Sequence, residues 1–262
     1  MNRRIYDVFE IPDRAFLGRR VYKKHFYDNA PMNAADRALF RDDIDVITWS
    51  YTLKPNTVAI PPYDDGVHEY IEIAVLHVIL NRAGRVSKIA ELIHKAIPYP
   101  LILVFEYDPT GDEGGSPATE WAISVAPKRV SRSSADALVV HEVLTTPWLR
   151  LDTDQSTVRQ FLDSLRMKNL PATHFYALYN SIADRIRSLN LARHSGRFVV
   201  ATTDEDRLQQ REQAERYEQL EAELRRLRTA LKREPQFNRK VELSMEIQRL
   251  KKELQGITDS VS

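Results

Sequence analysis

The last quarter of the chain carries an apolar pattern that is symmetric about residue 237, and this pattern constrains the fold more than any other feature. Large apolar side chains recur at spacings of three and four before residue 237, and in the reverse order after it. An antiparallel coiled coil requires this arrangement, because facing residues must lie at the same height. The paired positions are Leu231 and Leu243, Leu227 and Ile247, Leu224 and Leu250, Leu220 and Leu254, and Tyr217 and Ile257.

The residues at the centre of symmetry favour a turn. Pro235 disfavours the helical conformation in Glu234, and Asn238 can cap a returning helix. The alternative is a single long helix that dimerises, but its interior would hold Pro235 at a cost of about 3 kcal/mol or more. We therefore predict an antiparallel helical hairpin over residues 202–262.

Basic side chains gather near the predicted turn. One interpretation is a solvated surface in which residues four apart form ion pairs. The other is a tip that contacts phosphates or an acidic protein surface. The candidate partner-binding residues at this tip are Arg225, Arg228, Lys232, Arg233, Phe237, Arg239 and Lys240.

The rest of the chain predicts an α+β fold, with a mostly antiparallel sheet covered by helices over residues 1–150. Residues 46–53 and 57–60 are expected to form a hairpin, with Trp49, Tyr51 and Leu53 on one face. Residues 70–80 are almost continuously apolar, which is typical of a central strand buried on both faces. Further strands are expected at residues 101–107 and 120–126. A helical pair over residues 151–201 is expected to pack on this domain.

Composition excludes several functions. The chain has no cysteine, which removes thiol catalysis, cysteine-ligated zinc and disulfides. A net charge of +1 means that any electrostatic partner must be bound by a local patch. The chain shows no signal peptide and no apolar run long enough to span a bilayer. We expect a soluble, cytoplasmic protein without a cofactor, a metal or a membrane contact.

No catalytic motif stands out, and the best enzymatic alternative is a restriction-type, metal-dependent nuclease. That chemistry needs two acidic residues, a nearby lysine and a divalent metal. Glu72 within a predicted strand, Glu106 at a strand end and Lys128 after another strand are the candidates. However, neither glutamate is followed two positions later by lysine. Glu72 is instead expected to lie at an edge or to pair with a basic residue such as Arg129.

A second basic cluster lies near the N-terminus, and Tyr22 and Phe26 are interleaved with it. Basic and aromatic residues together can bind single-stranded nucleic acid. An ordinary surface element with its aromatic side chains turned inward is the alternative. The nucleic-acid candidates are Arg19, Arg20, Lys23 and Lys24.

Six stretches of the chain are informative together, at residues 23–26, 49–55, 70–73, 93–100, 126–129 and 232–243. In these stretches the chain resembles an uncharacterised family of bacterial and archaeal proteins, a domain of unknown function. Genes of that family often lie beside helicases and DNA methyltransferases in restriction and phage-defence clusters. The resemblance implies a subunit that acts with such enzymes, and it brings no catalytic residues.

These observations favour a non-catalytic adaptor or assembly subunit of a bacterial anti-phage or restriction-like complex. The hairpin is expected to bind a large protein partner, such as a helicase or a methyltransferase. DNA is a further candidate partner, contacted directly or through that protein. The nuclease and a nucleic-acid-binding module that uses the basic tip remain the alternatives.

Overall fold

The computed structural model describes residues 5–29, 31–109, 119–130, 138–140 and 142–260, and the chain forms two compact units. The first unit covers residues 1–186 and the second covers residues 187–262. The three-part division at about residues 150 and 201 stays a prediction. The fold is α+β, with a mixed but mostly antiparallel sheet followed by a C-terminal helical hairpin, as the sequence predicted.

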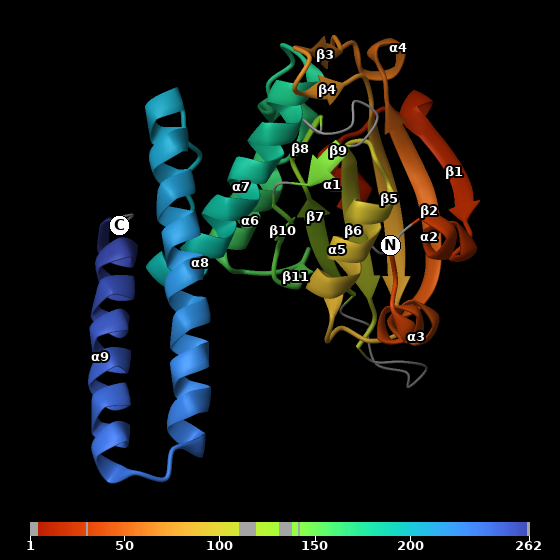
Figure 1. The fold of residues 1–262 in the computed structure, drawn as a ribbon. Helices are drawn as coiled ribbons and strands as arrows, with labels where there is room; N and C mark the ends of the chain where they lie inside the picture. The colour runs from red at the N-terminus through yellow and green to blue at the C-terminus, as the bar shows by residue number, and fades with distance from the viewer. Residues whose placement is uncertain (1–4, 30, 110–118, 131–137, 141, 261–262) are drawn as a thin grey trace. The chain divides into compact units, whose positions relative to one another are not determined.

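The first unit is built on a seven-stranded sheet of order β1-β2-β5-β6-β7-β10, with β11 also paired to β7 (Figure 1). Among the strands that the structure describes, only β5 and β6 run parallel, and helix α5 connects them. The strands are β1 (Phe16–Val21), β2 (Ile44–Leu53), β5 (Ile73–Leu80), β6 (Leu101–Tyr107), β7 (Glu120–Val125), β10 (Leu144–Thr145) and β11 (Leu149–Arg150). Two small hairpins pair β3 (Tyr63–Asp64) with β4 (Glu69–Tyr70), and β8 (Lys128–Val130) with β9 (Leu138–Val140).

Helices cover the sheet and then continue into the second unit. The helices are α1 (Ile5–Phe9), α2 (Lys24–Asn29), α3 (Ala34–Asp43), α4 (Pro55–Val58), α5 (Val86–Ala96), α6 (Ser156–Ser164), α7 (Phe175–Ser195), α8 (Asp204–Arg233) and α9 (Phe237–Ser260), with 3-10 turns at Asp13–Ala15 and Met167–Asn169. Asn33 caps α3 by accepting a hydrogen bond from the Asp36 backbone N–H at 2.9 Å.

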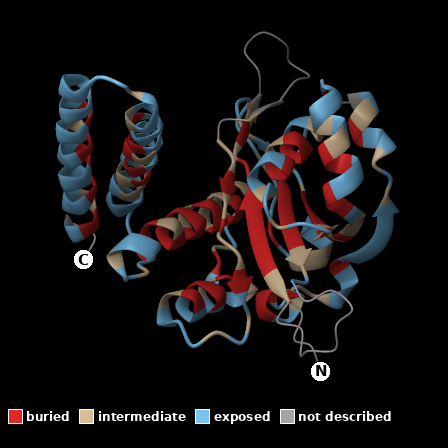
Figure 2. Ribbon diagram, turned by 90° about the horizontal axis from the view of Figure 1, so that it is seen from below, coloured by how far each residue is buried: buried red, intermediate tan, exposed pale blue. Residues whose placement is uncertain are grey.

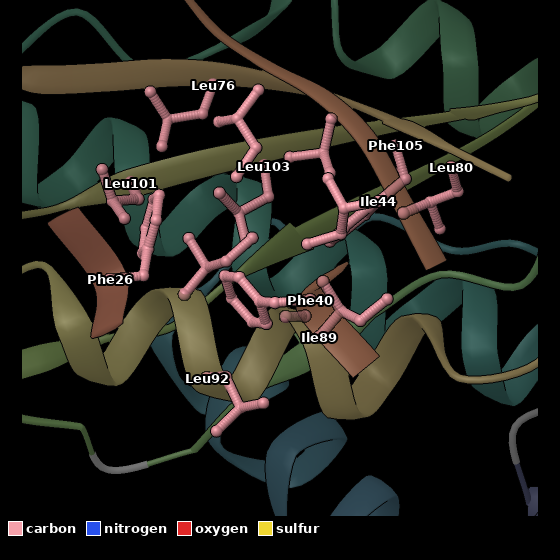
Figure 3. Packing of buried hydrophobic residues seen from close by; sticks show 14 of the residues in the cluster. Phe26, Phe40, Ile44, Leu76, Leu80, Ile89, Leu92, Leu101, Leu103 and Phe105 are labelled. Atoms are coloured by element: carbon pink, nitrogen blue, oxygen red, sulfur yellow. The ribbon is translucent and has the colours of Figure 1, made fainter. Parts of the chain in front are cut away.

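The main core lies between one face of the sheet and helices α2, α3 and α5 (Figure 3). Alternate residues of β5 point into it, among them Leu76 and Val78, and they meet Ile89 and Ile93 of α5. Side chains alternate between the two faces of a strand. His77 therefore lies on the opposite face of the sheet, where the Tyr6 ring of α1 contacts it edge-on at 5.8 Å.

Strand β2 contains a bulge that the sequence pattern does not reveal. Trp49 pairs with Leu76, whereas Tyr51 pairs with the adjacent residue Val75, so Ser50 is the extra residue. One extra residue reverses the alternation of side chains. The expectation that Trp49 shares a face with Tyr51 was therefore wrong. Trp49 packs on the main core, and Tyr51 contacts Tyr6 on the opposite face.

The prediction of a strand at residues 57–60 is also wrong, because the first half of this segment belongs to the one-turn helix α4. Pro55 occupies the first turn of the helix, where its fixed φ is already helical. The Thr57 hydroxyl accepts a hydrogen bond from the Lys54 backbone N–H at 2.8 Å. Ala59 ends the helix in the left-handed conformation at φ 56°. Strand β2 consequently pairs with β1 and β5 instead of forming a local hairpin.

The second unit contains the predicted antiparallel hairpin of α8 and α9. Its seam holds all ten residues that the symmetric pattern selects, with eight of them in the buried set and Leu231 and Ile257 half-buried. Buried residues form a stripe along each helix and exposed residues cover the remaining surface (Figure 2). Leu191 and Ala214 extend the same apolar cluster.

The turn between the two helices differs from the prediction in one residue. Helix α9 begins at Phe237, so Asn238 lies in its first turn and does not cap it. The Gln236 carbonyl accepts the first helical hydrogen bond from the Lys240 backbone N–H at 3.0 Å. The Glu234 carboxylate accepts a hydrogen bond from the Gln236 backbone N–H at 3.0 Å. Pro235 fits between them, because it has no N–H to satisfy.

Candidate functional site

The structure does not bring the three nuclease candidates together. Glu72 precedes β5 instead of lying within a strand, and it pairs with Lys54 at 3.1 Å rather than with Arg129. Glu106 lies near the other end of the sheet, next to His77 Nε2 at 2.8 Å. Glu72 is two residues before Ala74, which pairs with Leu101, and Glu106 is five residues after Leu101. At about 3.3 Å per residue the backbone positions of the two glutamates are offset by roughly 23 Å along the strands.

Lys128 is buried, with only 2% of its surface exposed. Its ammonium nitrogen donates hydrogen bonds to the backbone carbonyls of Ile97 and, at 2.8 Å, of Tyr99. Ile97 is the residue that caps the C-terminus of α5, where helix carbonyls lack partners within the helix. Burial lowers the Lys128 pKa to about 7. Lys128 therefore acts as an internal cap of α5, and its burial leaves no access for a substrate.

Buried polar side chains surround this cap. The Tyr70 hydroxyl accepts a hydrogen bond from the Lys128 backbone N–H at 3.0 Å. On α7, the Tyr179 hydroxyl donates to the Leu101 carbonyl at 2.7 Å and accepts from the Ala126 N–H at 2.8 Å. Burial raises the pKa of both tyrosines, so each hydroxyl keeps its proton and can donate. These bonds anchor α7 to the ends of β6 and β7.

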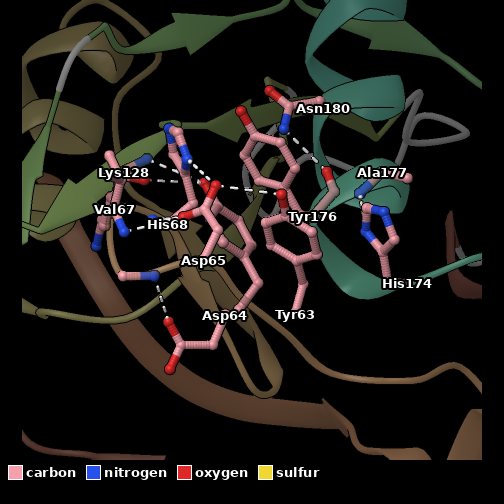
Figure 4. A network of polar contacts seen from close by, with 12 residues as sticks. Tyr63, Asp64, Asp65, Val67, His68, Lys128, His174, Tyr176, Ala177 and Asn180 are labelled. Atoms are coloured by element: carbon pink, nitrogen blue, oxygen red, sulfur yellow. Dashed lines mark hydrogen bonds and ion pairs between the residues drawn. The ribbon is translucent and has the colours of Figure 1, made fainter.

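A cluster of rings and carboxylates links the β3–β4 hairpin to the start of α7 (Figure 4). Tyr63 stacks on His174 and Tyr176 with centroid distances of 4.4 and 4.9 Å. Asp65 accepts hydrogen bonds from the His68 and Val67 backbone N–H groups, which hold the pKa of its carboxyl well below the ordinary range. The contacts stay within the cluster, so they stabilise the turn and fix the hairpin on α7.

The four residues of the N-terminal basic cluster differ in their exposure to solvent. Lys23 turns inward, where its ammonium donates to the carbonyls of Ile44 and, at 3.3 Å, of Arg41. Arg19, Arg20 and Lys24 are exposed. Strand β1 stands at the edge of the sheet, and the Arg20 guanidinium lies 5.9 Å from the Tyr22 ring. Three of the four candidates therefore remain on the surface.

Two of the six basic candidates at the tip of the hairpin are held in ion pairs. Arg225 pairs with Glu221 at 3.0 Å and Arg239 pairs with Glu242 at 2.6 Å, each along its own helix. In the part of the chain that the structure describes, no ion pair within 4 Å involves the remaining four basic candidates. These exposed residues are Arg228, Lys232, Arg233 and Lys240.

An open groove of about 610 Å³ runs along the outer surface of α9. Two of its apolar residues stand out because 77% of Phe237 and 70% of Met245 is exposed. Val241 lies between them, four residues from each. The groove is lined by Phe237, Lys240, Val241, Ser244, Met245, Gln248, Arg249 and Lys252.

The groove lies on the side of α9 away from the seam. With 3.6 residues per turn, each residue is rotated by about 100° from the one before it. Met245 is two residues before the seam residue Ile247, and so points about 160° away from it. The apolar surface of the groove is thus separate from the apolar surface that holds the hairpin together.

A comparison with protein families was informative. The family model of a domain of unknown function, DUF4391, matches residues 9–254. The chain belongs to the DUF4391 family. No match emerges among curated proteins or among solved structures.

The DUF4391 match covers the groove, the basic tip and every strand of the seven-stranded sheet. Within the described part of this DUF4391 chain, no group of three or more histidine, aspartate or glutamate side chains is arranged to hold a metal ion. No helix among those residues is long and apolar enough to cross a membrane.

Sequence reasoning selected Phe237, Lys240 and the basic tip, but it missed Val241 and Met245 in this DUF4391 chain. A signal for them is present in the sequence, because apolar residues recur at 237, 241 and 245 with the four-residue spacing of a helix face. The stronger seam pattern on the same helix obscures this signal. The two apolar surfaces differ in their side of the helix and, in the structure, in their exposure.

Proposed function

We propose that this protein is a non-catalytic, cytoplasmic adaptor of a bacterial anti-phage or restriction-like complex. Its C-terminal hairpin docks a large partner of the helicase or DNA methyltransferase type. The observation that carries the proposal is the exposed apolar surface of α9, formed by Phe237, Val241 and Met245, beside a seam that is already complete. The gene-neighbourhood resemblance supplies the class of complex.

The seam between α8 and α9 is complete without the exposed apolar residues of α9. Ten apolar residues of the two helices already form one cluster in the seam, and neither Phe237 nor Met245 belongs to it. Exposed apolar surface on a soluble protein commonly marks a site of protein interaction. The candidate nuclease side chains offer no comparable support, since each is engaged in a contact within the first unit.

The test is co-purification of the tagged full-length protein from its own host, beside a chain that ends at residue 202. We expect the full chain to retain a helicase or a methyltransferase and the shortened chain to lose it. Circular dichroism of the shortened chain, compared with the helix and strand content of residues 1–202, shows whether that chain is folded.

A second experiment distinguishes the loss of a binding surface from the loss of the fold. Met245→Glu in the full chain changes only an exposed position and should release the same partner. Leu208→Glu, at a position on α8 that is 60% exposed, should retain it. If the full chain captures neither class of enzyme, or if the shortened and folded chain captures as much, the adaptor function is wrong.

A second candidate function is nucleic-acid binding at the edge strand β1. Arg19, Arg20 and Lys24 are exposed beside Tyr22, and the guanidinium of Arg20 already contacts that ring. Cations next to an exposed ring suit a single strand, because the ring stacks a base while the cations contact phosphates.

This candidate predicts salt-dependent binding of single-stranded DNA by the full chain. Arg19→Ala combined with Arg20→Ala should weaken binding and reduce the dependence of log Kd on log salt by about 1 to 2. Fluorescence anisotropy of a labelled oligonucleotide measures both quantities. Arg226→Ala combined with Arg228→Ala is the matched control on α8, and an equal loss in that control would contradict a site at β1.

A further inference from the structure

We infer that the groove on α9 binds one acidic amphipathic helix of a partner protein, which lies along α9 as a third helix. The inference rests on the proposed adaptor function and specifies the chemistry of the docked segment. Residues 237–252 span roughly 22 Å at 1.5 Å per residue, which matches a partner helix of about 15 residues.

The apolar residues of the groove set the shape of the partner. Phe237, Val241 and Met245 follow a four-residue spacing on one side of α9. A helix that lays apolar residues of three- and four-residue spacing against such a row buries them in the same way as the α8–α9 seam. An unbranched methionine next to an exposed phenylalanine also adapts to partner side chains of different shapes.

The charges of the groove set the charge of the partner. Lys240, Arg249 and Lys252 line it, and no acidic residue does. The acidic residues of α9 lie elsewhere on the helix, and two of them are already paired, Glu242 with Arg239 and Glu253 with Arg216. A partner helix with glutamate or aspartate beside its apolar residues would neutralise the groove cations at the rim of the contact.

A second copy of the chain does not fit the same groove. A two-fold contact pairs a surface with itself. Such a contact would place Lys240, Arg249 and Lys252 of one copy against the same cations of the other, and like charges in close contact are repulsive. The phosphates of a nucleic acid would pair with the groove cations, but its charged backbone would then lie against the apolar side chains of Val241 and Met245. Nucleic acid therefore fits the groove less well than an acidic amphipathic helix.

The test measures binding of a designed, labelled peptide by the full-length protein with fluorescence anisotropy. The probe is a helix of about 15 residues with leucines at three- and four-residue spacings and flanking glutamates. A second peptide replaces every glutamate with lysine. We expect saturable binding of the acidic peptide, and weaker binding by about tenfold or more for the basic one.

Two pairs of variants locate the contact. Met245→Glu should weaken binding of the acidic peptide about tenfold or more, whereas Leu208→Glu should leave the binding unchanged. Lys252→Glu should weaken it, whereas Lys251→Glu should not, because Lys251 is exposed on the same helix but does not line the groove. All four positions are exposed, and circular dichroism confirms that each variant keeps its helices.

Several results would overturn the inference. These are no saturable binding of the acidic peptide, equal binding of the basic peptide, or equal effects of Lys251→Glu and Lys252→Glu. Displacement of the peptide by duplex DNA, with no effect of Met245→Glu, would assign the groove to nucleic acid. Dimerisation of the wild-type chain that Met245→Glu abolishes would assign it to a second copy.

The co-purification result remains independent of this outcome. A host enzyme that the hairpin retains, but that Met245→Glu and Lys252→Glu do not release, would leave the adaptor function standing and refute the groove as its contact. Peptide binding with no enzyme retained would support the groove as a helix-binding site and refute the adaptor function.

Discussion

At the scale of single residues, Lys128 illustrates how burial changes the function of a side chain. Its position after a strand made it a candidate for nuclease chemistry, but its nitrogen bonds the carbonyls of Ile97 and Tyr99. The charged ammonium has three N–H groups and the neutral amine has two, so either form can donate to both carbonyls. His94 lies in the same region, and burial, with the nearby Lys128 charge, lowers its pKa well below the ordinary value.

The burial of Lys128 predicts that stability rises with pH. The folded chain binds fewer protons than the unfolded chain between the folded pKa of about 7 and the ordinary value of 10.5. The free energy of unfolding should therefore rise by about 2 kcal/mol between about pH 7 and about pH 9. Urea unfolding at several pH values measures this change.

Matched lysine variants isolate the contribution of Lys128. Lys128→Met should flatten the pH dependence, and the exposed Lys251→Met should leave it as in the wild type. The slopes are compared, so a lower overall stability of Lys128→Met does not affect the result. An unchanged slope in Lys128→Met would show that other groups cause the dependence.

At the scale of elements, the α8–α9 hairpin is specified by its own sequence. Its partner residues come from one local pattern, and Pro235 sets the position of the turn. One error fell on an element that depends on distant strands. The bulge at Ser50 lies where β2 is matched to both β1 and β5. A pattern within one strand carries no information on that match.

The seam predicts a contrast between two leucines of α8. Leu224→Ala removes a buried side chain from the hairpin and should cost about 2–3 kcal/mol. Leu208→Ala changes an exposed side chain and should cost less than about 0.5 kcal/mol. Thermal unfolding followed by circular dichroism measures both, and equal effects would mean that the seam does not stabilise α8.

At the scale of the whole molecule, the two compact units have separate hydrophobic clusters. One lies against the sheet around Leu76 and Leu103, and the other lies in the hairpin seam. Separate clusters favour separate cooperative units of unfolding, because each unit loses its own buried area when it opens.

Hydrogen exchange of the Leu224→Ala variant tests this separation. We expect faster exchange of backbone amides within residues 204–260, and unchanged protection in β5 and β6. The reason is that the substitution weakens only the cluster to which Leu224 belongs. Loss of protection in β5 and β6 would show instead that both clusters unfold together.

The sequence by itself determined the α+β class, the strands β5, β6 and β7, and the hairpin with its seam, because helix and strand periodicities are local properties of the chain. Tertiary structure decided the sites. It engaged Glu72 with Lys54, placed Lys128 beneath the C-terminus of α5 and turned Lys23 inward. The burial and the partners of these three side chains depend on residues far along the chain, so the spacing of residues within one segment does not predict them.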